Sequence, residues 1–461
     1  MLDQHQFAPS ILREYDIRGV IGETLGPDDA YAIGRGFATI VRQHGGKRVC
    51  VGYDGRLSSP ELADRLIQGI KDAGAIAVLI GLGPTPQLYY AVHTLEAHGG
   101  IMVSGSHNPP NHNGFKFMLG QKSFFGEDIQ ALGRLAAEGG FLSGDGGEEI
   151  FDLKESYIDA LLTGIEKAGD RELKVAWDAG NGAAGEIMAS LSSKVPGQHH
   201  LLFEEIDGHF PNHHPDPAVL ANLVDLQNTV KDKCCDVGLA FDGDGDRVGV
   251  VDDKGEVIWP DQLMILYSQA VLKSMPGATI ISDVKASQIL FDEIAAAGGE
   301  PLMWKTGHSL VKTKMAETKA PLAGEMSGHI FFGDRFFGFD DGLYAAVRLL
   351  ELMTQLDQPL SEIRKAWPVL ANTPEIRFQC DDDKKFAVVD AVKSAAEKED
   401  CQLIAVDGVR AVYPEGWWLL RASNTQDSLV ARVEAKDEEA VVLLKSKLNA
   451  VLKVHNLVLP D

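Results

Sequence analysis

The sequence predicts an α/β protein of several domains that ends in a separate α+β domain. Short β-branched runs alternate with stretches of helical length over the first two-thirds of the 461 residues, and this order returns several times. From about residue 367 the pattern changes, because strands of alternating polarity then follow one another closely. The length agrees with several domains, since about 150 residues per domain gives roughly three.

The alternation of strand and helix begins at residues 47–54, an apolar run that predicts a buried strand. Residues 60–74 have the spacing of an amphipathic helix, and residues 75–83 return to a strand pattern. The same order starts again at three later apolar runs, which are residues 173–180, 235–243 and 278–284. This alternation predicts βαβ units with largely parallel sheets, and its recurrence predicts repeated domains of one design.

The C-terminal part has the pattern of an antiparallel sheet with two helices. Ile376, Phe378 and Cys380 alternate with polar neighbours, as in a half-buried strand. A helical stretch follows, and then come three closely spaced strand runs and a final helix, at residues 409–413, 417–423, 428–435 and 438–452. We therefore expect four domains, at residues 1–150, 151–253, 254–366 and 367–461.

The composition excludes several classes of partner. The chain has 67 acidic and 43 basic residues and a net charge of −24, whereas nucleic acids and anionic membranes are bound by basic surfaces. The five cysteines show no CxxC spacing, which argues against a disulfide scaffold. The sequence has neither a signal-peptide pattern nor an apolar run of membrane-spanning length. We expect a cytoplasmic monomer without a nucleic-acid or membrane partner.

The densest chemical motif is FDGDGDRVGV, which places Asp242, Asp244 and Asp246 between two apolar strands. In an extended loop these side chains point to one side, where three carboxylates repel each other unless a cation neutralises them. Oxygen ligands without His or Cys favour Mg²⁺. An EF-hand is excluded, because Arg247 stands where glycine is needed and Asp253 where glutamate is needed. A solvated acidic turn is the alternative interpretation.

A second motif, SGSHNPP, presents Ser106 on a loop that directly follows a buried strand. Glycine permits a close approach of the backbone and the prolines stiffen the loop, which suits a serine with an activated hydroxyl. An ordinary Ser/Asn/Pro loop is the alternative. We do not expect a Ser–His pair with His107, because neighbours in an extended chain face opposite sides.

A third motif matches the dinucleotide-binding fingerprint G-x-G-x-x-G. Gly180, Gly182 and Gly185 have the required spacing between a strand and a helix, and Glu205 follows at the expected distance. A single match is weak and leaves the acidic and serine loops unexplained. We therefore interpret these glycines as tight packing of a strand against a helix.

The remaining polar clusters each have two interpretations, as a turn or as a binding site. Lys305 and His308 follow a strand, and residues 325–329 offer a carboxylate and a hydroxyl of the kind that hold sugar hydroxyls. Residues 421–427, RASNTQD, suit a phosphate dianion. Asp340 and Asp341 form an acidic pair, of which Asp341 is explained as a helix N-cap. The histidines of HFPNHHPDP suggest zinc, but the prolines favour a rigid turn.

Five motifs in a fixed order resemble the α-D-phosphohexomutase family. They are REYDIRG, SGSHNPP, DGDGDR, GEMSGH and RASNT, and they span almost the whole chain. The resemblance implies four domains around a central cleft, of which three are mixed α/β domains of one topology and the fourth is a smaller α+β domain. Met326 is similar to the hexose mutases rather than to the glucosamine branch of the family.

The resemblance also implies roles for individual residues. Ser106 corresponds to the phosphoserine that donates and accepts the phosphoryl group, and one oxygen of its phosphate completes a Mg²⁺ site with Asp242, Asp244 and Asp246. The contacts to the sugar hydroxyls and to the distant phosphate are Glu325, Ser327, His308, Arg421, Ser423, Asn424 and Thr425. The remaining residues that line the cleft are Tyr15, Arg18, Lys116, Arg247, Lys285 and His329.

The implied activity is that of a phosphomannomutase/phosphoglucomutase, in which a hexose 1,6-bisphosphate is both intermediate and activator. His329, Lys116 and Arg18 are candidates for the general acid–base, and the sequence does not rank them. Three alternatives stay open at this point. They are a nicotinamide oxidoreductase based on GNGAAG, a sugar-phosphate-binding protein without catalysis, and a phosphatase.

Overall fold

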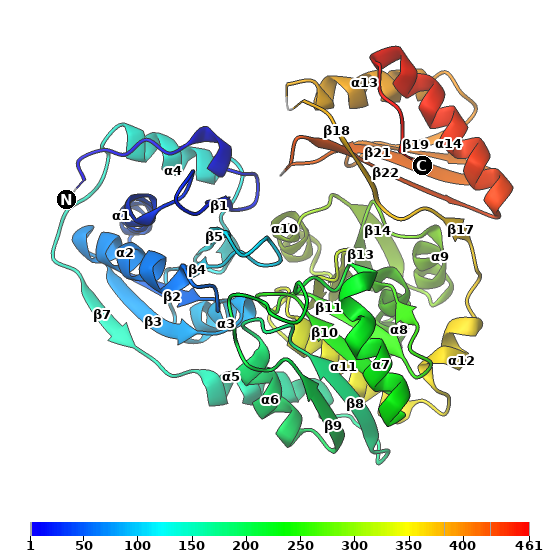
Figure 1. The fold of residues 1–461 in the computed structure, drawn as a ribbon, viewed down its shortest axis with the longest axis horizontal. Coiled ribbons are helices and arrows are strands. Elements are labelled where there is room, and N and C mark those ends of the chain that lie inside the picture. Colours follow the sequence, from blue (N-terminus) through cyan, green and yellow to red (C-terminus); the bar gives the residue numbers. More distant parts are fainter. Residues whose placement is uncertain (1, 382, 425, 461) are drawn as a thin grey trace.

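Four β-sheets follow one another along the chain, each covered by its own helices (Figure 1). The computed structural model describes residues 2–381, 383–424 and 426–460. The first sheet and its helices lie on the left in Figure 1, the second and third form the centre, and the fourth stands apart at the upper right. An α/β protein with a C-terminal α+β domain was predicted, and the structure confirms this fold class.

The first sheet has the strand order β1-β5-β4-β2-β3-β7, with β6 paired to β5. Its strands are β1 (Ile17–Val20), β2 (Arg48–Tyr53), β3 (Ile76–Leu82), β4 (Gly99–Val103), β5 (His112–Leu119), β6 (Lys122–Ser123) and β7 (Gly147–Ile150). Its helices are η1 (Pro9–Ile11), α1 (Pro27–Gln43), α2 (Ser59–Asp72), α3 (Thr85–Thr94) and α4 (Glu127–Ala137).

The second sheet has the order β12-β11-β10-β8-β9. Its strands are β8 (Leu173–Asp178), β9 (Gly197–Leu202), β10 (Val237–Phe241), β11 (Val248–Asp252) and β12 (Val257–Ile258). The helices of this region are α5 (Lys154–Leu162), η2 (Thr163–Ile165), α6 (Gly185–Lys194), η3 (Leu220–Leu223) and α7 (Val224–Lys233). Because β12 pairs with β11, the second sheet continues beyond residue 253.

The third sheet has the order β14-β13-β15-β16. Its strands are β13 (Thr279–Asp283), β14 (Glu300–Trp304), β15 (Leu322–Gly324) and β16 (Ile330–Phe332). The helices of this region are α8 (Pro260–Ser274), α9 (Gln288–Ala296), α10 (His308–Thr318), α11 (Gly342–Gln355) and α12 (Leu360–Lys365).

The first three sheets share one topology around their central strands. In each, the first strand of the motif pairs in parallel with the second and the third, and the third then pairs antiparallel with the fourth. The four strands are β2, β3, β4 and β5 in the first sheet, β8, β9, β10 and β11 in the second, and β13, β14, β15 and β16 in the third. This confirms the prediction of repeated domains of one design.

The same topology positions three predicted motifs at equivalent points. The serine loop joins β4 to β5, the acidic loop joins β10 to β11, and the GEMSGH loop joins β15 to β16. Each loop therefore follows a strand that is buried along its whole length, which fixes where the loop begins.

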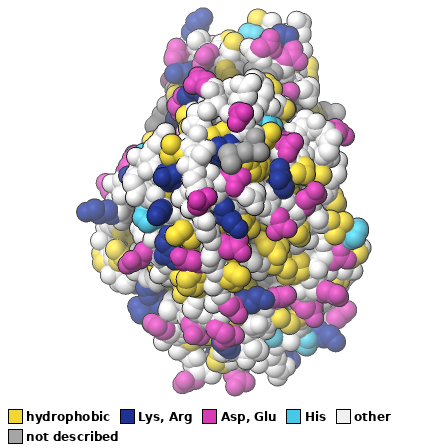
Figure 2. All heavy atoms as spheres, turned by 90° about the vertical axis from the view of Figure 1, so that its left-hand side faces the viewer, with side chains coloured by type: hydrophobic (Ala, Val, Ile, Leu, Met, Phe, Trp, Pro, Cys, Tyr) yellow, Lys and Arg dark blue, Asp and Glu magenta, His cyan; other side chains and the backbone are white. Residues whose placement is uncertain are grey.

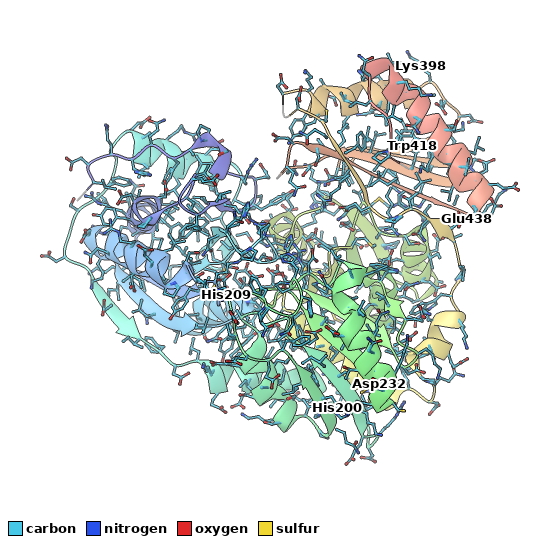
Figure 3. All side chains as sticks on the ribbon, viewed as in Figure 1. His200, His209, Asp232, Lys398, Trp418 and Glu438 are labelled. Carbon is cyan, nitrogen blue, oxygen red and sulfur yellow. The ribbon has the colours of Figure 1, made fainter. Side chains whose placement is uncertain are left out.

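The fourth sheet is antiparallel, with the order β17-β22-β21-β20-β19 and with β18 paired to β22. Its strands are β17 (Ala371–Asn372), β18 (Ile376–Gln379), β19 (Gln402–Ile404), β20 (Val409–Tyr413), β21 (Gly416–Ala422) and β22 (Ser428–Ala435). Helices α13 (Lys385–Ala396) and α14 (Glu438–Leu452) pack on it, and η4 (Lys453–His455) follows. Trp418 lies within this sheet (Figure 3) and is buried.

The cysteines and the surface of the molecule are as follows. All five cysteines are free. Within the residues that the structure describes, no helix is long and apolar enough to cross a membrane. Figure 2 shows one face of the molecule, on which acidic, basic and apolar side chains are interspersed.

Candidate active site

The serine loop and the acidic loop meet at the junction of the first two domains. Ser106 Oγ donates a hydrogen bond to Asp242 Oδ2 at 2.9 Å, and Ser104 Oγ donates to Asp244 Oδ2 at 2.9 Å. The two backbones also touch, since a Cβ added at Gly243 would lie 2.3 Å from the Ser106 carbonyl oxygen. Residues that are far apart in the sequence are thus held together as a single buried site.

Three carboxylates converge in this site, as the spacing of the motif predicts. Asp242, Asp244 and Asp246 are fully buried and offer oxygens that lie within 4.8 Å of one another. The loop is a turn rather than an extended segment, and Gly245 adopts a φ of +74° within it. Burial, and then the two neighbouring carboxylates, raise the pKa of Asp242 well above its ordinary value. The three buried carboxylates therefore need positively charged neighbours.

Lys116, on β5, supplies part of that charge. Its Nζ donates to Asp244 Oδ2 and to Asp246 Oδ2, both at 2.6 Å. Although burial favours a neutral amine, these carboxylates raise the pKa of Lys116 above its usual range. Burial likewise opposes ionisation of Asp244, but Lys116 and hydrogen bonds from Thr85 and Ser104 hold the pKa of Asp244 below its ordinary value. Lys116 is therefore a permanent cation in the site.

The cluster also fits a divalent cation. Asp244 Oδ1 and Asp246 Oδ1 are buried and have no hydrogen-bond partner among the described residues. Such oxygens are costly to bury unless something binds them. Carboxylate oxygens are the ligands of hard cations, so the three aspartates are able to hold a metal ion.

Ser106 itself has an unusual backbone conformation. Its φ of +48° lies in the left-handed region, which β-carbon-bearing residues rarely adopt. As a consequence, Ser106 Oγ lies 3.0 Å from His107 Nδ1. The prediction that these neighbours face opposite sides was wrong, because it assumed an extended chain. Burial, followed by the charge of Arg247, lowers the pKa of His107 well below its usual value, so this imidazole is neutral.

His329 lies at the other end of the acidic cluster. Its Nε2 accepts a hydrogen bond from Arg247 Nε at 3.0 Å. Its Nδ1 is 3.1 Å from Asp340 Oδ2 and 3.5 Å from Asp246 Oδ1. The His308 ring stacks against it with centroids 5.4 Å apart. Arg247 and His329 thus lie beside the carboxylates, as the resemblance implies.

Contacts continue from His308 to the fourth domain. Gly307 N donates to Glu325 Oε1 at 2.6 Å, which places this buried carboxylate beside the first turn of α10. Tyr15 donates its hydroxyl proton to the Thr306 carbonyl at 2.8 Å, and Asn424 Nδ2 donates to the Tyr15 hydroxyl at 2.6 Å. Segments of the first, third and fourth domains therefore meet at Tyr15.

Two further charged groups lie in the same region. Arg421 Nε donates to Asp407 Oδ2 at 2.9 Å, and the same oxygen accepts from Thr306 N at 3.0 Å. Lys285 Nζ donates to Glu375 Oε2 at 3.1 Å. The side chain of Arg421 is thereby oriented by the fourth domain and linked to the third.

The other predicted residues are placed as follows. Arg18 Nη2 donates to Asp16 Oδ2 at 2.5 Å, and Ser327 is half-buried in the loop between β15 and β16. Ser423 N donates to the Ser428 carbonyl at 2.9 Å, within the loop between β21 and β22. Thr425 lies outside the described residues.

The G-x-G-x-x-G segment has a packing role in this structure. A Cβ added at Gly182 would lie 2.9 Å from the Gly243 carbonyl oxygen and 3.1 Å from that of Asp242, and one at Gly185 would meet the Glu204 carbonyl at 2.0 Å. These glycines let the chain pass close behind the acidic loop, which agrees with the packing interpretation.

The histidine loop lies against the first domain, where Figure 3 labels His209. His213 Nε2 lies 3.0 Å from Asp178 Oδ2, and the His214 ring bonds to the His107 carbonyl oxygen. Among the described residues, the clusters able to hold a metal do not include these histidines. The rigid-turn interpretation is therefore the one that fits.

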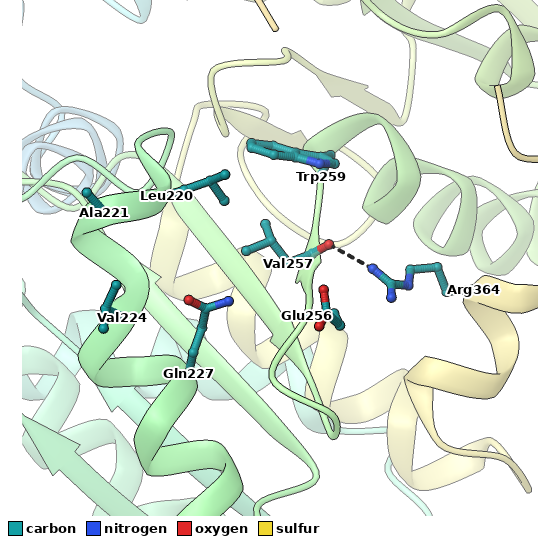
Figure 4. Close-up of a pocket in the computed structure, with 8 residues that line it drawn as sticks. All are labelled: Leu220, Ala221, Val224, Gln227, Glu256, Val257, Trp259 and Arg364. Carbon is teal, nitrogen blue, oxygen red and sulfur yellow. Dashed lines mark hydrogen bonds between the residues drawn. The ribbon is translucent and has the colours of Figure 1, made fainter. Parts of the chain in front are cut away.

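A hollow of about 520 Å³ lies elsewhere, between α7, β12 and α12 (Figure 4). Arg364 Nη1 donates there to the Val257 carbonyl at 3.2 Å. The residues that line it are Leu220, Ala221, Val224, Gln227, Glu256, Val257, Trp259 and Arg364. None of these residues is a predicted site residue. We therefore place the candidate site at the buried cluster of carboxylates, on the basis of its chemistry.

Sequence reasoning missed several residues that support this site. Arg56, Asp407 and Thr85 come from segments without a motif. Asp340 belongs to a noted acidic pair, but it was set aside together with Asp341. The structure confirms Asp341 as an N-cap, since its Oδ1 accepts from Tyr344 N at 2.9 Å. Asp340 could have been singled out from the sequence, because the N-cap role explains Asp341 and leaves the carboxylate of Asp340 unexplained.

Comparison with known proteins finds matches over most of the chain. Four segments match the phosphoglucomutase/phosphomannomutase alpha/beta/alpha domains I, II and III and the C-terminal domain, at residues 9–139, 155–255, 259–370 and 375–450.

Individual relatives carry the same names. A phosphomannomutase/phosphoglucomutase of Pseudomonas aeruginosa is 46% identical over 451 residues, which cover 98% of this chain and 97% of the relative. A phosphoglucomutase of Neisseria meningitidis is 42% identical and covers 98% of this chain and 99% of its own. A crystal structure of a phosphoglucomutase/phosphomannomutase family protein from Burkholderia thailandensis has a TM-score of 0.93 and 42% identity, with 99% and 100% coverage. This chain therefore belongs to the phosphoglucomutase/phosphomannomutase family.

Proposed function

We propose that this enzyme reversibly moves a phosphoryl group between the 1- and 6-positions of glucose or mannose phosphates. Phosphorylated Ser106 and a hexose 1,6-bisphosphate are the two intermediates of this proposal. The observation that carries it is the contact between Ser106 Oγ and Asp242 at 2.9 Å within a cluster of buried carboxylates. Such a cluster beside a hydroxyl suits phosphoryl transfer, in which positioning and charge stabilisation dominate.

Each half of the reaction exchanges one ester bond for another. The bond between Ser106 Oγ and phosphorus breaks, and a bond forms between phosphorus and the free hydroxyl oxygen of the sugar phosphate. The bisphosphate then turns in the cleft, and its other phosphoryl group returns to Ser106. In the first half the sugar hydroxyl gives up its proton and Ser106 Oγ takes up a proton as it leaves phosphorus, and in the second half both proton transfers are reversed.

A divalent cation, Mg²⁺ in our proposal, would be held by Asp242, Asp244 and Asp246 and would supply positive charge to the transferring group. Lys116 and Arg247 add fixed positive charge around the same cluster, since Lys116 Nζ lies 2.6 Å from two of its carboxylates and Arg247 Nε lies 3.9 Å from the third. Preorganised charge of this kind is the main means by which a protein stabilises such a transition state.

Among the candidates for the general acid–base, the geometry favours His329. Lys116 is committed as a cation to Asp244 and Asp246, and Arg18 is paired with Asp16. His329 Nδ1 lies 3.1 Å from the Asp340 carboxylate, and we propose that His329 Nε2 exchanges the hydrogen bond from Arg247 Nε for the sugar hydroxyl and accepts its proton.

The remaining residues suit a substrate that is read in two orientations. We assign Glu325, Ser327 and His308 to the sugar hydroxyls. Arg421, Ser423, Asn424 and Thr425 are assigned to the distant phosphate, with Tyr15 and Lys285 beside them. Because the same groups must serve both orientations, we expect weak discrimination at the 2-hydroxyl and activity on both glucose and mannose phosphates.

Replacing the proposed phosphoserine tests this function directly. Ser106→Ala should abolish conversion of glucose 1-phosphate to glucose 6-phosphate in a coupled assay with glucose 1,6-bisphosphate, while its melting temperature stays close to that of wild type. Ser193→Ala, at an exposed serine, serves as the control. Wild-type turnover of Ser106→Ala would refute the proposal.

Intact mass separates the alternatives to a mutase. An active mutase should show a gain of about 80 Da on part of the molecules, consistent with one phosphoryl group. A sugar-phosphate-binding protein without catalysis would lack this species, and a phosphatase would release inorganic phosphate without forming the isomer. An oxidoreductase would bind NAD. The cytoplasmic location, the monomeric state and the domain limits of 1–150, 151–253, 254–366 and 367–461 stay predictions.

A further inference from the structure

One arginine binds the backbone of the loop that carries Ser106. Arg56 follows β2 and is 1% exposed. Its Nη2 donates to the carbonyl oxygens of Ser106 at 2.7 Å and Asn108 at 2.6 Å. Its Nη1 donates to those of Pro109 at 2.7 Å and His112 at 2.9 Å. The terminal nitrogens of a guanidinium carry four N–H bonds, so all four are used by this loop.

The guanidinium is itself fixed by two domains. Asp54 Oδ2 lies 3.4 Å from Arg56 Nε and also accepts a hydrogen bond from Gly105 N at 3.0 Å. The ring of Phe210, from the second domain, lies 5.4 Å from the guanidinium carbon. Arg56 therefore has a buried counter-ion on one side and an aromatic face on another, which leaves it little freedom to move.

This contact explains how the serine loop keeps its conformation. Ser106 has a φ of +48°, which a serine adopts only where its surroundings enforce it. Glycine at position 105 lets Arg56 approach the loop closely, because a Cβ at this position would lie 2.3 Å from Arg56 Nε. The carbonyls on both sides of the turn are thus bound by one rigid group, and the Ser106 hydroxyl is directed at Asp242.

We propose that Arg56 is a positioning residue for phosphoryl transfer, which holds Ser106 in the left-handed conformation by binding four carbonyl oxygens of residues 106–112. Arg56 acts through Ser106 and need not touch the substrate. A lysine cannot replace it, because an ammonium group is a compact donor without the planar fork of a guanidinium. This inference rests on the proposed role of Ser106 as the phosphorylated residue.

The test compares Arg56→Lys with a matched substitution of another buried arginine. Arg35, on α1, is 3% exposed and also donates to backbone carbonyls, those of Leu2 and Leu142, away from the serine loop. For wild type, Arg56→Lys and Arg35→Lys, we would measure kcat and KM for glucose 1-phosphate. We would also measure the rate at which the dephosphorylated enzyme gains a phosphoryl group from glucose 1,6-bisphosphate, by intact mass.

Arg56→Lys should lower kcat and the loading rate by about 10²-fold, the loss typical of a misplaced reacting group. KM should stay close to wild type, and Arg35→Lys should leave all three quantities near wild type. Wild-type loading by Arg56→Lys, a loss confined to KM, or an equal loss in Arg35→Lys would overturn the proposal.

A second variant covers the case in which Arg56→Lys does not fold. Gly105→Ala keeps the arginine but forces it away, since the added methyl group would lie 2.3 Å from Nε. It should also load slowly, and wild-type loading would overturn the inference. The two proposals fail differently. Turnover by Ser106→Ala would refute the phosphoserine, whereas an inactive Ser106→Ala together with normal transfer by Arg56→Lys would refute only the role of Arg56.

Discussion

At the scale of single residues, the site depends on how buried negative charge is compensated. The three aspartates of the acidic loop are fully buried, and Lys116 binds two of them. A buried carboxylate without a counter-charge is strongly destabilising, so Lys116 stabilises the cluster. In our proposal a divalent cation and Lys116 share the neutralisation of these carboxylates.

This division of charge predicts the behaviour of Lys116→Met. Removing one partner of a buried ion pair costs about 3–5 kcal/mol, so the melting temperature should fall in EDTA. Mg²⁺ should then raise it by more in the variant than in wild type. Mutase activity of wild type should be lost in EDTA and return with Mg²⁺.

Thermal unfolding with EDTA or with Mg²⁺ measures this effect, and Lys122→Met, at an exposed lysine, is the control. An equal Mg²⁺-induced shift in wild type and in Lys116→Met would argue against shared neutralisation by Lys116 and the cation, and the absence of a shift in both would argue against a cation at the aspartates. Turnover that is insensitive to chelation would argue against it as well.

Single residues also show where sequence reasoning stops. The D-x-D-x-D spacing predicted the convergence of Asp242, Asp244 and Asp246, although the loop that brings them together is a turn and not the extended segment on which the prediction relied. The contact between Ser106 and His107 was not predictable in this way, since it depends on a left-handed φ that only the surroundings maintain. Arg56 gives no local signal, because its four partners lie some fifty residues further along the chain.

At the scale of elements, three equivalent loops hold most of the residues of the candidate site. Each joins the third strand of the shared topology to its antiparallel partner, which places the serine, acidic and GEMSGH loops at the same point of their sheets. The sequence predicts β4 and β10 from apolar runs but gives no such prediction for β15, and the antiparallel return of β5, β11 and β16 depends on pairing between strands. The requirement for glycine at position 182 likewise depends on contacts between segments, because a Cβ there would meet the backbone of Gly243 and Asp242.

Asp341, the N-cap of helix α11, gives a prediction about how stability depends on pH. Burial raises the pKa of Asp341 to about 7, although Tyr344 N and the Tyr157 hydroxyl donate to its carboxylate. The folded protein therefore keeps a proton here that the unfolded chain loses near pH 4. As the pH rises from the unfolded to the folded pKa, this contribution of Asp341 to stability is lost.

Asp341→Asn should therefore gain stability relative to wild type by about 2 kcal/mol between pH 5 and pH 8. Urea unfolding at both pH values measures the difference. Asp437→Asn, at the exposed N-cap of α14, is the matched control. A stability difference that is the same at both pH values would show that Asp341 is ionised throughout.

At the scale of the whole molecule, the fourth domain is connected to the first across the site. In Figure 1 the end of the fourth sheet lies above α10 and to the right of the first domain. Tyr15 makes the connection, since its hydroxyl donates to the Thr306 carbonyl and accepts from Asn424. The resemblance to the family implied four domains around a cleft, but neither hydrogen bond has a signal in the sequence, because each joins residues of different domains.

Tyr15→Phe should weaken this connection. Loss of two hydrogen bonds of about 1 kcal/mol each, about 2 kcal/mol together, should lower kcat/KM for glucose 1-phosphate roughly thirtyfold. The radius of gyration from small-angle scattering should increase. Tyr90→Phe, which loses a hydroxyl bond to the Ser156 carbonyl away from the site, is the control. An unchanged kcat/KM and radius for Tyr15→Phe would show that the bridge does not contribute.

The most direct measurement of the central claim is a single turnover of labelled phosphoenzyme. Enzyme whose phosphoryl group carries ³²P is mixed with unlabelled glucose 1-phosphate, and label on the protein and on the sugar is followed in time. The account predicts that label leaves Ser106, as located by peptide mapping, and enters glucose 1,6-bisphosphate at a rate at least equal to kcat. Label that stays on the protein during turnover, or that maps to another residue, would contradict it.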